Sequence, residues 1–294
     1  MSKGPSAALT SDEIGAMARD AIAEGQADRK QAASQKIQPL REAQRHQPEA
    51  AMALVWIVDQ HSLARDEAAG LLLEIADAHD DDIGVLSALG QCLEAVRDID
   101  DLNAPPPDHP IFRTMVEKLG RLAKLHEGPR EQEWILRGLA TAARMMARQN
   151  DAIAEHCLRK LVEIDPRKSP PHYNLGLFYK TRGRFAEGVA ANQAAASLSQ
   201  EVIDSHQWNL GICATGAGNA EIAMDVWKRM GQKIEPGRFG LPEGGYPACK
   251  VKLAERPLAE RAADSDDPGQ EETVWIERLS PCHGIIRSVL YGKL

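Results

Sequence analysis

The sequence predicts an all-α protein whose helices pair into hairpins and stack, followed by a small β-rich segment at the C-terminus. Three observations support this prediction. Residues 49–238 carry apolar side chains at helical spacing, without strand-like alternation. Breaker residues such as Pro105–Pro107 and Pro236-Gly237 interrupt this pattern at intervals. Finally, Asn174-Leu175-Gly176 recurs 35 residues later as Asn209-Leu210-Gly211, and repetition at such a period is typical of stacked helical repeats.

The composition of the 294-residue chain agrees with this class. Hydrophobic residues make up 43% of the sequence and aromatic residues only 4%, which favours close helix packing over a β-sandwich. The formal net charge is −8. A broad nucleic-acid surface is therefore not expected, because non-specific affinity for phosphates comes from lysine and arginine.

The cysteine pattern indicates reduced thiols, because the number is odd, the spacing is wide and no CxxC pair occurs. The five residues are Cys92, Cys157, Cys213, Cys249 and Cys282. The first ten residues lack a basic and then apolar leader, and no apolar run approaches the roughly 20 residues that span a bilayer. We expect a cytoplasmic protein without a membrane partner.

Residues 1–48 are expected to form an N-terminal helix and a linker. Thr10 or Ser11 is a suitable helix cap, with Asp12 and Glu13 in the first turn. One face of this helix then carries apolar residues at helical spacing: Ile14, Met17, Ala18, Ala21 and Ile22. Residues 25–46 are rich in Gln, Arg and Lys and are interpreted as a solvated helix or a linker.

Residues 49–134 show weaker signs of repetition. Ala68, Leu72 and Ile75 mark a second helix of a hairpin, and Leu89-Gly90 marks the first helix of the next. An insertion at 103–108 contains three prolines and cannot be helical. An apolar stripe follows it: Met115, Val116, Leu119, Leu122 and Leu125. We assign this region to degenerate helical repeats.

The clearest repeat signal lies at residues 169–203. Leu175-Gly176 is followed by Tyr179, then by Gly183 and the small Ala195. A glycine within a helix lets a second helix approach closely, and a glycine at a turn adopts backbone angles that side chains disfavour. The set recurs in part at residues 204–236, with Leu210-Gly211, Gly218, Ala223, Trp227 and Pro236.

This arrangement resembles the tetratricopeptide repeat (TPR) family, most clearly over residues 135–236. The first helix from Ile135 departs from the family pattern, with Ala142 where Gly is usual and Met145 where Tyr is usual. The resemblance implies a right-handed solenoid of helical hairpins with a concave surface for a protein or peptide partner. We expect five hairpins: two degenerate ones within 49–134 and three TPR-like ones within 135–238.

The resemblance also indicates which side chains line the inner face. The candidate partner-binding residues are Tyr173, Asn174, Leu177, Lys180, Trp208, Asn209 and Ile212. An amide can bind a peptide backbone through its donors and its acceptor, and aromatic rings are typical of binding hot spots. The alternative is that these amides and rings serve packing alone. Since Lys180 is the only cation at these positions, we expect an apolar or mixed peptide rather than a clamped carboxylate.

Residues 239–294 differ in character. After a Gly- and Pro-rich stretch, alternating or β-branched residues predict strands at 250–253, 273–279 and 284–290. Two or three strands are marginally stable alone, so this segment either packs on the last helices or belongs to a longer protein, and we favour the second. Cys282-His283 is the one pair here with metal-binding or nucleophilic chemistry, although we favour a structural turn.

These observations predict a non-enzymatic adaptor or scaffold that requires no cofactor and no metal. Two other hypotheses remain open. In the first, the C-terminal segment with Cys282 and His283 is a metal-binding or catalytic module that the repeats target. In the second, the chain associates with itself through its end repeats.

Overall fold

The computed structural model describes residues 8–97, 109–146, 148–199, 201–237, 239–254 and 271–286. The helices in this part of the chain are α1 (Ser11–Gln26), α2 (Lys30–Lys36), α3 (Gln38–Ala43), α4 (Pro48–Asp59), α5 (Arg65–Ala78), α6 (Ile83–Val96), α7 (Pro110–Leu125), α8 (Pro129–Met145), α9 (Asp151–Ile164), α10 (Ser169–Thr181), α11 (Phe185–Leu198), α12 (Asp204–Gly216) and α13 (Ala220–Arg229). The strands are β1 (Glu235–Pro236), β2 (Pro242–Glu243), β3 (Cys249–Ala254), β4 (Glu271–Arg278) and β5 (Gly284–Ile286). The predicted all-α class with a small β-rich C-terminal segment is confirmed.

The chain divides into two compact units, which we call unit 1 (Met1–Asp165) and unit 2 (Pro166–Leu294). The division falls inside the stretch 135–238 that the sequence assigns to TPR repeats. None of the helices within the described ranges is both long and apolar enough to cross a membrane.

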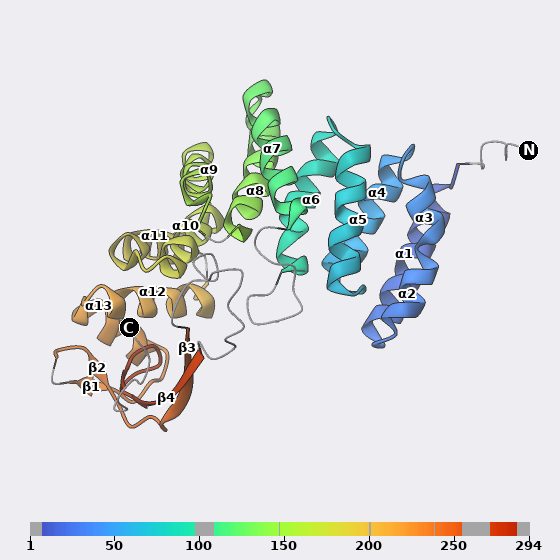
Figure 1. Cartoon of the computed structure of the whole chain (residues 1–294). Coiled ribbons are helices and arrows are strands. Elements are labelled where there is room, and N and C mark those ends of the chain that lie inside the picture. The colour runs from blue at the N-terminus through green and yellow to red at the C-terminus, as the bar shows by residue number, and fades with distance from the viewer. Residues whose placement is uncertain are drawn as a thin grey trace, which may run out of the picture. The chain divides into compact units, whose positions relative to one another are not determined.

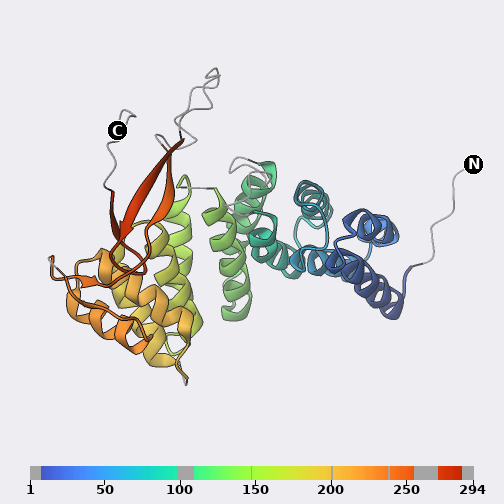
Figure 2. The same cartoon turned by 90° about the horizontal axis from the view of Figure 1, so that it is seen from below.

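The described part of unit 1 contains four helical hairpins and the short helix α3. Helix α1 pairs with α2, α4 with α5, α6 with α7, and α8 with α9. The first helices of successive hairpins also pack on each other, as Figure 1 and Figure 2 show for α4, α6 and α8. The contact between α6 and α8 needs glycine on both sides, because a Cβ on Gly90 would lie 2.7 Å from the Cα of Gly138.

The start of α1 confirms Thr10 as its cap. The Thr10 hydroxyl accepts a hydrogen bond from the Glu13 backbone N–H at 3.3 Å, and the Glu13 carboxylate accepts one from the Thr10 backbone N–H at 2.8 Å. This reciprocal pair satisfies two N–H groups that the first turn of a helix leaves without partners.

Residues 25–46 were predicted to form a solvated helix or a linker, and the structure contains the helices α2 and α3 there, so only the linker is corrected. Ala33, Ile37 and Leu40 have no solvent exposure, and α3 packs on α4. These three side chains stand at i, i+4 and i+7, so they form one buried stripe beneath a surface of Gln, Lys and Arg. The sequence did not predict this N-terminal hairpin of α1 and α2. The described part of the chain therefore contains one more hairpin than predicted, six rather than five.

Unit 2 contains the remaining two hairpins, α10 with α11 and α12 with α13, and α10 packs on α12. Gly183 and Gly218 lie at the turns of the two hairpins with φ of +71° and +72°, a conformation that favours glycine. Gly211 permits α12 to approach α13, because a Cβ there would lie 2.6 Å from the Trp227 ring. These glycines therefore have the turn and packing roles that the sequence predicts.

The C-terminal strands form two small antiparallel sheets. β1 pairs with β2, and β3, β4 and β5 form a second sheet in that order. Val251 lies opposite Val274, and Ile276 lies opposite Ile286. The strands predicted at 250–253 and 273–279 are confirmed, and the one predicted at 284–290 is confirmed over 284–286. Its remaining residues lie outside the described part of the chain.

The β-rich segment packs on the last helical hairpin. A buried cluster joins the two: Val189, Leu210, Cys213, Ala214, Ala223, Val226, Trp227 and Ile234. Tyr246 and Cys282 of the C-terminal segment pack against this cluster, and β1 and β2 contact α13. The sheets are therefore stabilised by the helices, and the interpretation of the chain as a fragment stays a prediction.

Candidate functional site

The predicted inner-face residues of unit 2 lie on α10 and α12. Helix α10 begins with Pro170 and Pro171 in its first turn, where the absent N–H groups and the fixed φ of proline do not interrupt hydrogen bonding. Helix α12 begins after the extended residue Ile203. Because α10 and α12 are the first helices of neighbouring hairpins, side chains on their common face lie side by side.

A hollow of about 510 Å³ is lined by residues of these two helices and by Met230. Its other lining residues are Tyr173, Asp204, Ser205, Trp208 and Asn209. The Tyr173 ring lies 4.8 Å from the His206 ring, centroid to centroid, and the Trp208 ring meets Trp227 edge to face at 5.1 Å. Both aromatic side chains are thus held by buried partners, while Trp208 remains 39% exposed.

Asn209 is held at the hollow by a contact between the two helices. The Lys180 ammonium donates a hydrogen bond to Asn209 Oδ1 at 2.6 Å. Since an ammonium has no acceptor, this bond fixes which end of the amide is oxygen. Asn209 is only 3% exposed, and its Nδ2 has no hydrogen-bond partner. Partial burial lowers the pKa of Lys180.

An unpartnered buried amide nitrogen is uncommon, because leaving such a group unsatisfied costs about 1–3 kcal/mol. The Nδ2 of Asn209 belongs to a lining residue of the hollow. A ligand carbonyl oxygen that enters the hollow is a suitable acceptor for it. The arrangement can therefore pack an apolar group against the exposed Trp208 ring beside Tyr173, and the buried Asn209 Nδ2 at this hollow has no partner within the chain.

The predicted residues are not all brought together. Tyr173, Trp208 and Asn209 line the hollow, and Lys180 supports it through Asn209. Asn174 and Leu177 lie half-buried on α10 and outside the lining. Ile212 packs against the buried cluster, so its side chain stabilises the fold of the free protein.

Cys282 and His283 lie in a turn between β4 and β5, as favoured from the sequence. The Ser280 hydroxyl accepts hydrogen bonds from the backbone N–H groups of Cys282 and His283, both at 3.2 Å, and lies 2.6 Å from His283 Nδ1. The Leu279 N–H donates to the His283 carbonyl at 3.0 Å. These bonds close the turn from within.

The chemistry of this turn gives no support to the alternative of a metal-binding or catalytic module. Burial raises the pKa of the Cys282 thiol, and it raises that of Cys213 in the same cluster to about 11. A thiol is a poor nucleophile and metal ligand when its pKa is raised. In the described ranges, no group of three or more His, Cys, Asp or Glu residues is placed to hold a metal ion.

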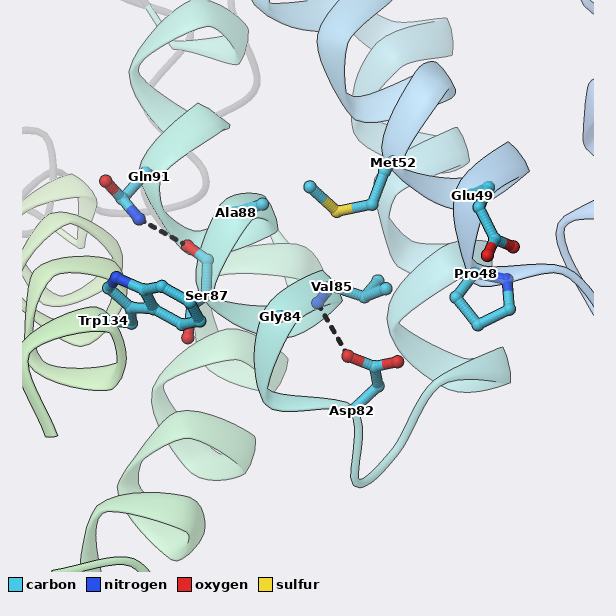
Figure 3. A pocket seen from close by; sticks show the side chains of 10 residues that line it. All are labelled: Pro48, Glu49, Met52, Asp82, Gly84, Val85, Ser87, Ala88, Gln91 and Trp134. Carbon is cyan, nitrogen blue, oxygen red and sulfur yellow. Dashed lines mark hydrogen bonds between the residues drawn. The ribbon is translucent and has the colours of Figure 1, made fainter. Parts of the chain in front are cut away.

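The sequence analysis missed a larger hollow in unit 1. It measures about 640 Å³ and lies across α4, α6 and α8 (Figure 3). Its apolar lining consists of Pro48, Met52, Val85, Ala88 and Trp134. Met52 and Trp134 are 41% and 42% exposed, and because both line one hollow they form an apolar surface patch rather than isolated exposed residues.

A sequence signal for this hollow was available. Counted from Leu89-Gly90 as the equivalent of Leu210-Gly211, the first four of the six inner positions of α6 are Gly84, Ser87, Ala88 and Gln91. All four line the hollow. The equivalent positions in α12 include Ser205, Trp208 and Asn209, which line the hollow of unit 2.

No protein-family model matches the chain, and no curated protein is significantly similar to it. Among solved structures, MamA from Desulfovibrio magneticus RS-1 is 18% identical over 61% of this chain and 92% of that chain, with a TM-score of 0.40. A thermophilic TPR protein of Thermus thermophilus is 18% identical over 57% and 83%, also at 0.40. Pseudomonas aeruginosa PilF is 12% identical over 75% and 93%, at 0.46.

With TM-scores below 0.5, these similarities carry no argument about the fold or about partners. The assignment of the fold rests on the paired antiparallel helices, on the packing of first helix on first helix, and on the glycines at the helix contacts and turns. The fold of the chain is TPR-like, as the sequence predicts.

Proposed function

We propose that the chain is a non-enzymatic scaffold that binds a protein or peptide partner through the hollow between α10 and α12. The observation that carries this proposal is the combination of an exposed Trp208 ring and an unpartnered Asn209 Nδ2 in one hollow. A peptide satisfies both, because its side chain covers the ring and its backbone carbonyl accepts from the amide.

The other predicted residues have supporting roles in this proposal. Lys180 holds the amide of Asn209 by its hydrogen bond, and Tyr173 borders the hollow beside His206. Asn174 and Leu177 extend the face of α10 that a longer peptide would follow, and Ile212 fixes α12 on its core. The free cysteines are consistent with a reducing compartment such as the cytoplasm.

The test uses three single variants that separate binding from folding. Trp208→Ala removes the exposed ring. Asn209→Asp keeps an acceptor for Lys180 and the size of the side chain but removes the Nδ2 donor. Trp275→Ala is the matched control, because Trp275 is a 55% exposed tryptophan of the same unit that does not line the hollow.

Proteins are captured from a native lysate with each variant, and the affinity of the captured partner is then measured by calorimetry. We expect the partner to bind wild type and Trp275→Ala equally, and to bind Trp208→Ala and Asn209→Asp at least about 10-fold more weakly. Capture of the same proteins by all four chains, or of none, would overturn the proposal. Denaturation in urea confirms that each variant is folded.

A further inference from the structure

The hollow of unit 1 differs in chemistry from that of unit 2. Its sides come from three successive first helices: α4 supplies Met52, α6 supplies Ala88, and α8 supplies Trp134 (Figure 3). The volume of about 640 Å³ lies within the roughly 300–1,000 Å³ typical of ligand pockets. Trp56 lies one turn after Met52 on the same face of α4 and is 45% exposed, so the apolar surface extends along the helix.

The charged residues that line this hollow are both acidic. Glu49 stands in the first turn of α4 and Asp82 at the start of α6, and Figure 3 shows both on the side of the hollow opposite Trp134. Glu49 forms no ion pair with any described residue. Asp82 accepts one hydrogen bond from the Val85 backbone N–H at 2.9 Å, which leaves its second oxygen for another donor.

A basic side chain at the start of α8 is already engaged by the Trp134 ring. The Arg130 guanidinium lies 4.8 Å from the centroid of the Trp134 ring, and Arg130 does not line the hollow. It restricts the position of the ring without neutralising the acids across the hollow.

The floor of the hollow also contains a polar atom without a partner. Ser87 is 2% exposed, and its hydroxyl has no hydrogen-bond partner. Beside it, the side-chain amide of Gln91 donates to the Ser87 carbonyl at 3.2 Å, which leaves the amide oxygen of Gln91 as an acceptor. The Ser87 hydroxyl is buried, so the exposed amide of Gln91 is the polar group of this pair that a ligand in the hollow can reach.

We propose that this hollow binds a peptide segment in which an apolar side chain is flanked by lysine or arginine. The apolar group packs between Met52 and Trp134, and the cation lies at Glu49 and Asp82. A backbone N–H of the peptide donates to the amide oxygen of Gln91. This inference concerns a second site and does not depend on the proposed function of the hollow in unit 2.

Two probes of opposite charge test the chemistry. The first is a fluorescent synthetic peptide with chemically neutralised ends. It contains two leucines and two lysines, each separated from the next by an alanine. The second carries glutamate in place of each lysine. Fluorescence anisotropy with the full chain gives the affinity of each. We expect the lysine peptide to bind and to weaken as salt is added, and the glutamate peptide to bind more weakly or not at all.

Variants locate the binding in unit 1. Glu49→Gln combined with Asp82→Asn removes both charges and retains a capping side chain at the start of α6, so affinity for the lysine peptide should fall about 3- to 10-fold. Glu49→Lys should raise affinity for the glutamate peptide. Trp134→Ala should weaken the lysine peptide by at least about 10-fold. Leu125→Ala is the matched control, because Leu125 is 66% exposed on α7 and outside the hollow.

The outcomes separate this inference from the proposed function. Binding that Trp208→Ala abolishes and Trp134→Ala leaves unchanged would place the peptide in unit 2, which overturns the inference and leaves the proposed function standing. Equal binding of both peptides, or no binding of either up to about 1 mM of protein, where a contact worth about 4 kcal/mol is detected, would also overturn it.

Discussion

Replacing Gly176 by alanine is the sharpest test of how the hairpins pack. A Cβ at this position would lie 2.6 Å from the Cγ, Nδ2 and Oδ1 atoms of Asn192 on α11. Asn192 has no solvent exposure, and its Nδ2 donates a hydrogen bond to the Gly188 carbonyl at 2.8 Å. The side chain is short and buried, so it cannot yield without losing this bond or moving the helix.

The magnitude follows from three terms. Forcing an extra carbon into a packed contact costs about 1–3 kcal/mol. Displacing the Asn192 amide loses a hydrogen bond worth about 0.5–1.5 kcal/mol. Alanine in place of glycine within a helix returns about 1 kcal/mol. We therefore expect Gly176→Ala to lower the free energy of unfolding by about 2 kcal/mol.

Urea denaturation followed by circular dichroism measures this change, and Gly120→Ala is its control. Gly120 lies within α7 with no heavy atom within 4 Å of its notional Cβ, so its substitution should stabilise the chain by about 1 kcal/mol. Combining Gly176→Ala with Asn192→Ala should destabilise less than the sum of the two single changes. If Gly176→Ala proves as stable as wild type, the close approach of α10 and α11 is wrong.

Two further predictions concern buried polar groups of unit 2. Thr215→Val removes the hydroxyl that accepts the Trp227 Nε1–H hydrogen bond at 3.1 Å, so it should lower the free energy of unfolding in urea by about 1–3 kcal/mol. The control Thr181→Val, at an exposed position, should leave the free energy of unfolding almost unchanged. Equal effects of the two changes would contradict the role of this bond. Burial lowers the pKa of His206, so the unfolded chain binds this proton more tightly and stability should fall as the pH drops from about 7 toward 5. His206→Gln should make that fall shallower, and an unchanged slope would refute the assignment to His206. His283, whose pKa burial also lowers, and carboxylates whose pKa is lowered, such as Glu74 beside Arg41, contribute to the fall in both chains.

Local patterns were sufficient for the helices and turns of unit 2. Gly176, Gly183 and Gly218 each have one backbone or packing reason to be glycine, and the structure bears out that reason at each. The strands of the β-rich segment were also predictable from local patterns, because short runs of β-branched and aromatic residues favour strands. The polar composition of residues 25–46 did not distinguish a helix from a linker. Three buried residues in this polar stretch are enough to pack a helix onto its neighbour.

The site was only partly predictable, because its chemistry depends on contacts between helices. The resemblance placed Lys180 and Asn209 on the inner face, but it could not reveal that one donates to the other across 29 residues. Asn209 is therefore a buried amide whose oxygen is bonded to Lys180 and whose nitrogen has no partner, rather than an exposed amide. A substitution by alanine would therefore disturb Lys180 as well, which is why Asn209→Asp is the more informative variant.

The hollow of unit 1 was not predicted, because the repeat period gave the wrong start for the first helix of one hairpin. Counting repeats backward in steps of the family period places the start of a first helix at Ile135, so Trp134 falls outside it. Helix α8 in fact begins at Pro129, because proline is accepted in a first turn and Gln132 there bonds the carbonyl of Ala123 at 2.8 Å. The added turn carries Trp134 over α6 to the edge of the hollow. A periodic pattern thus predicts which face of a helix is the inner one, whereas the residue at which the helix begins determines how long that face is.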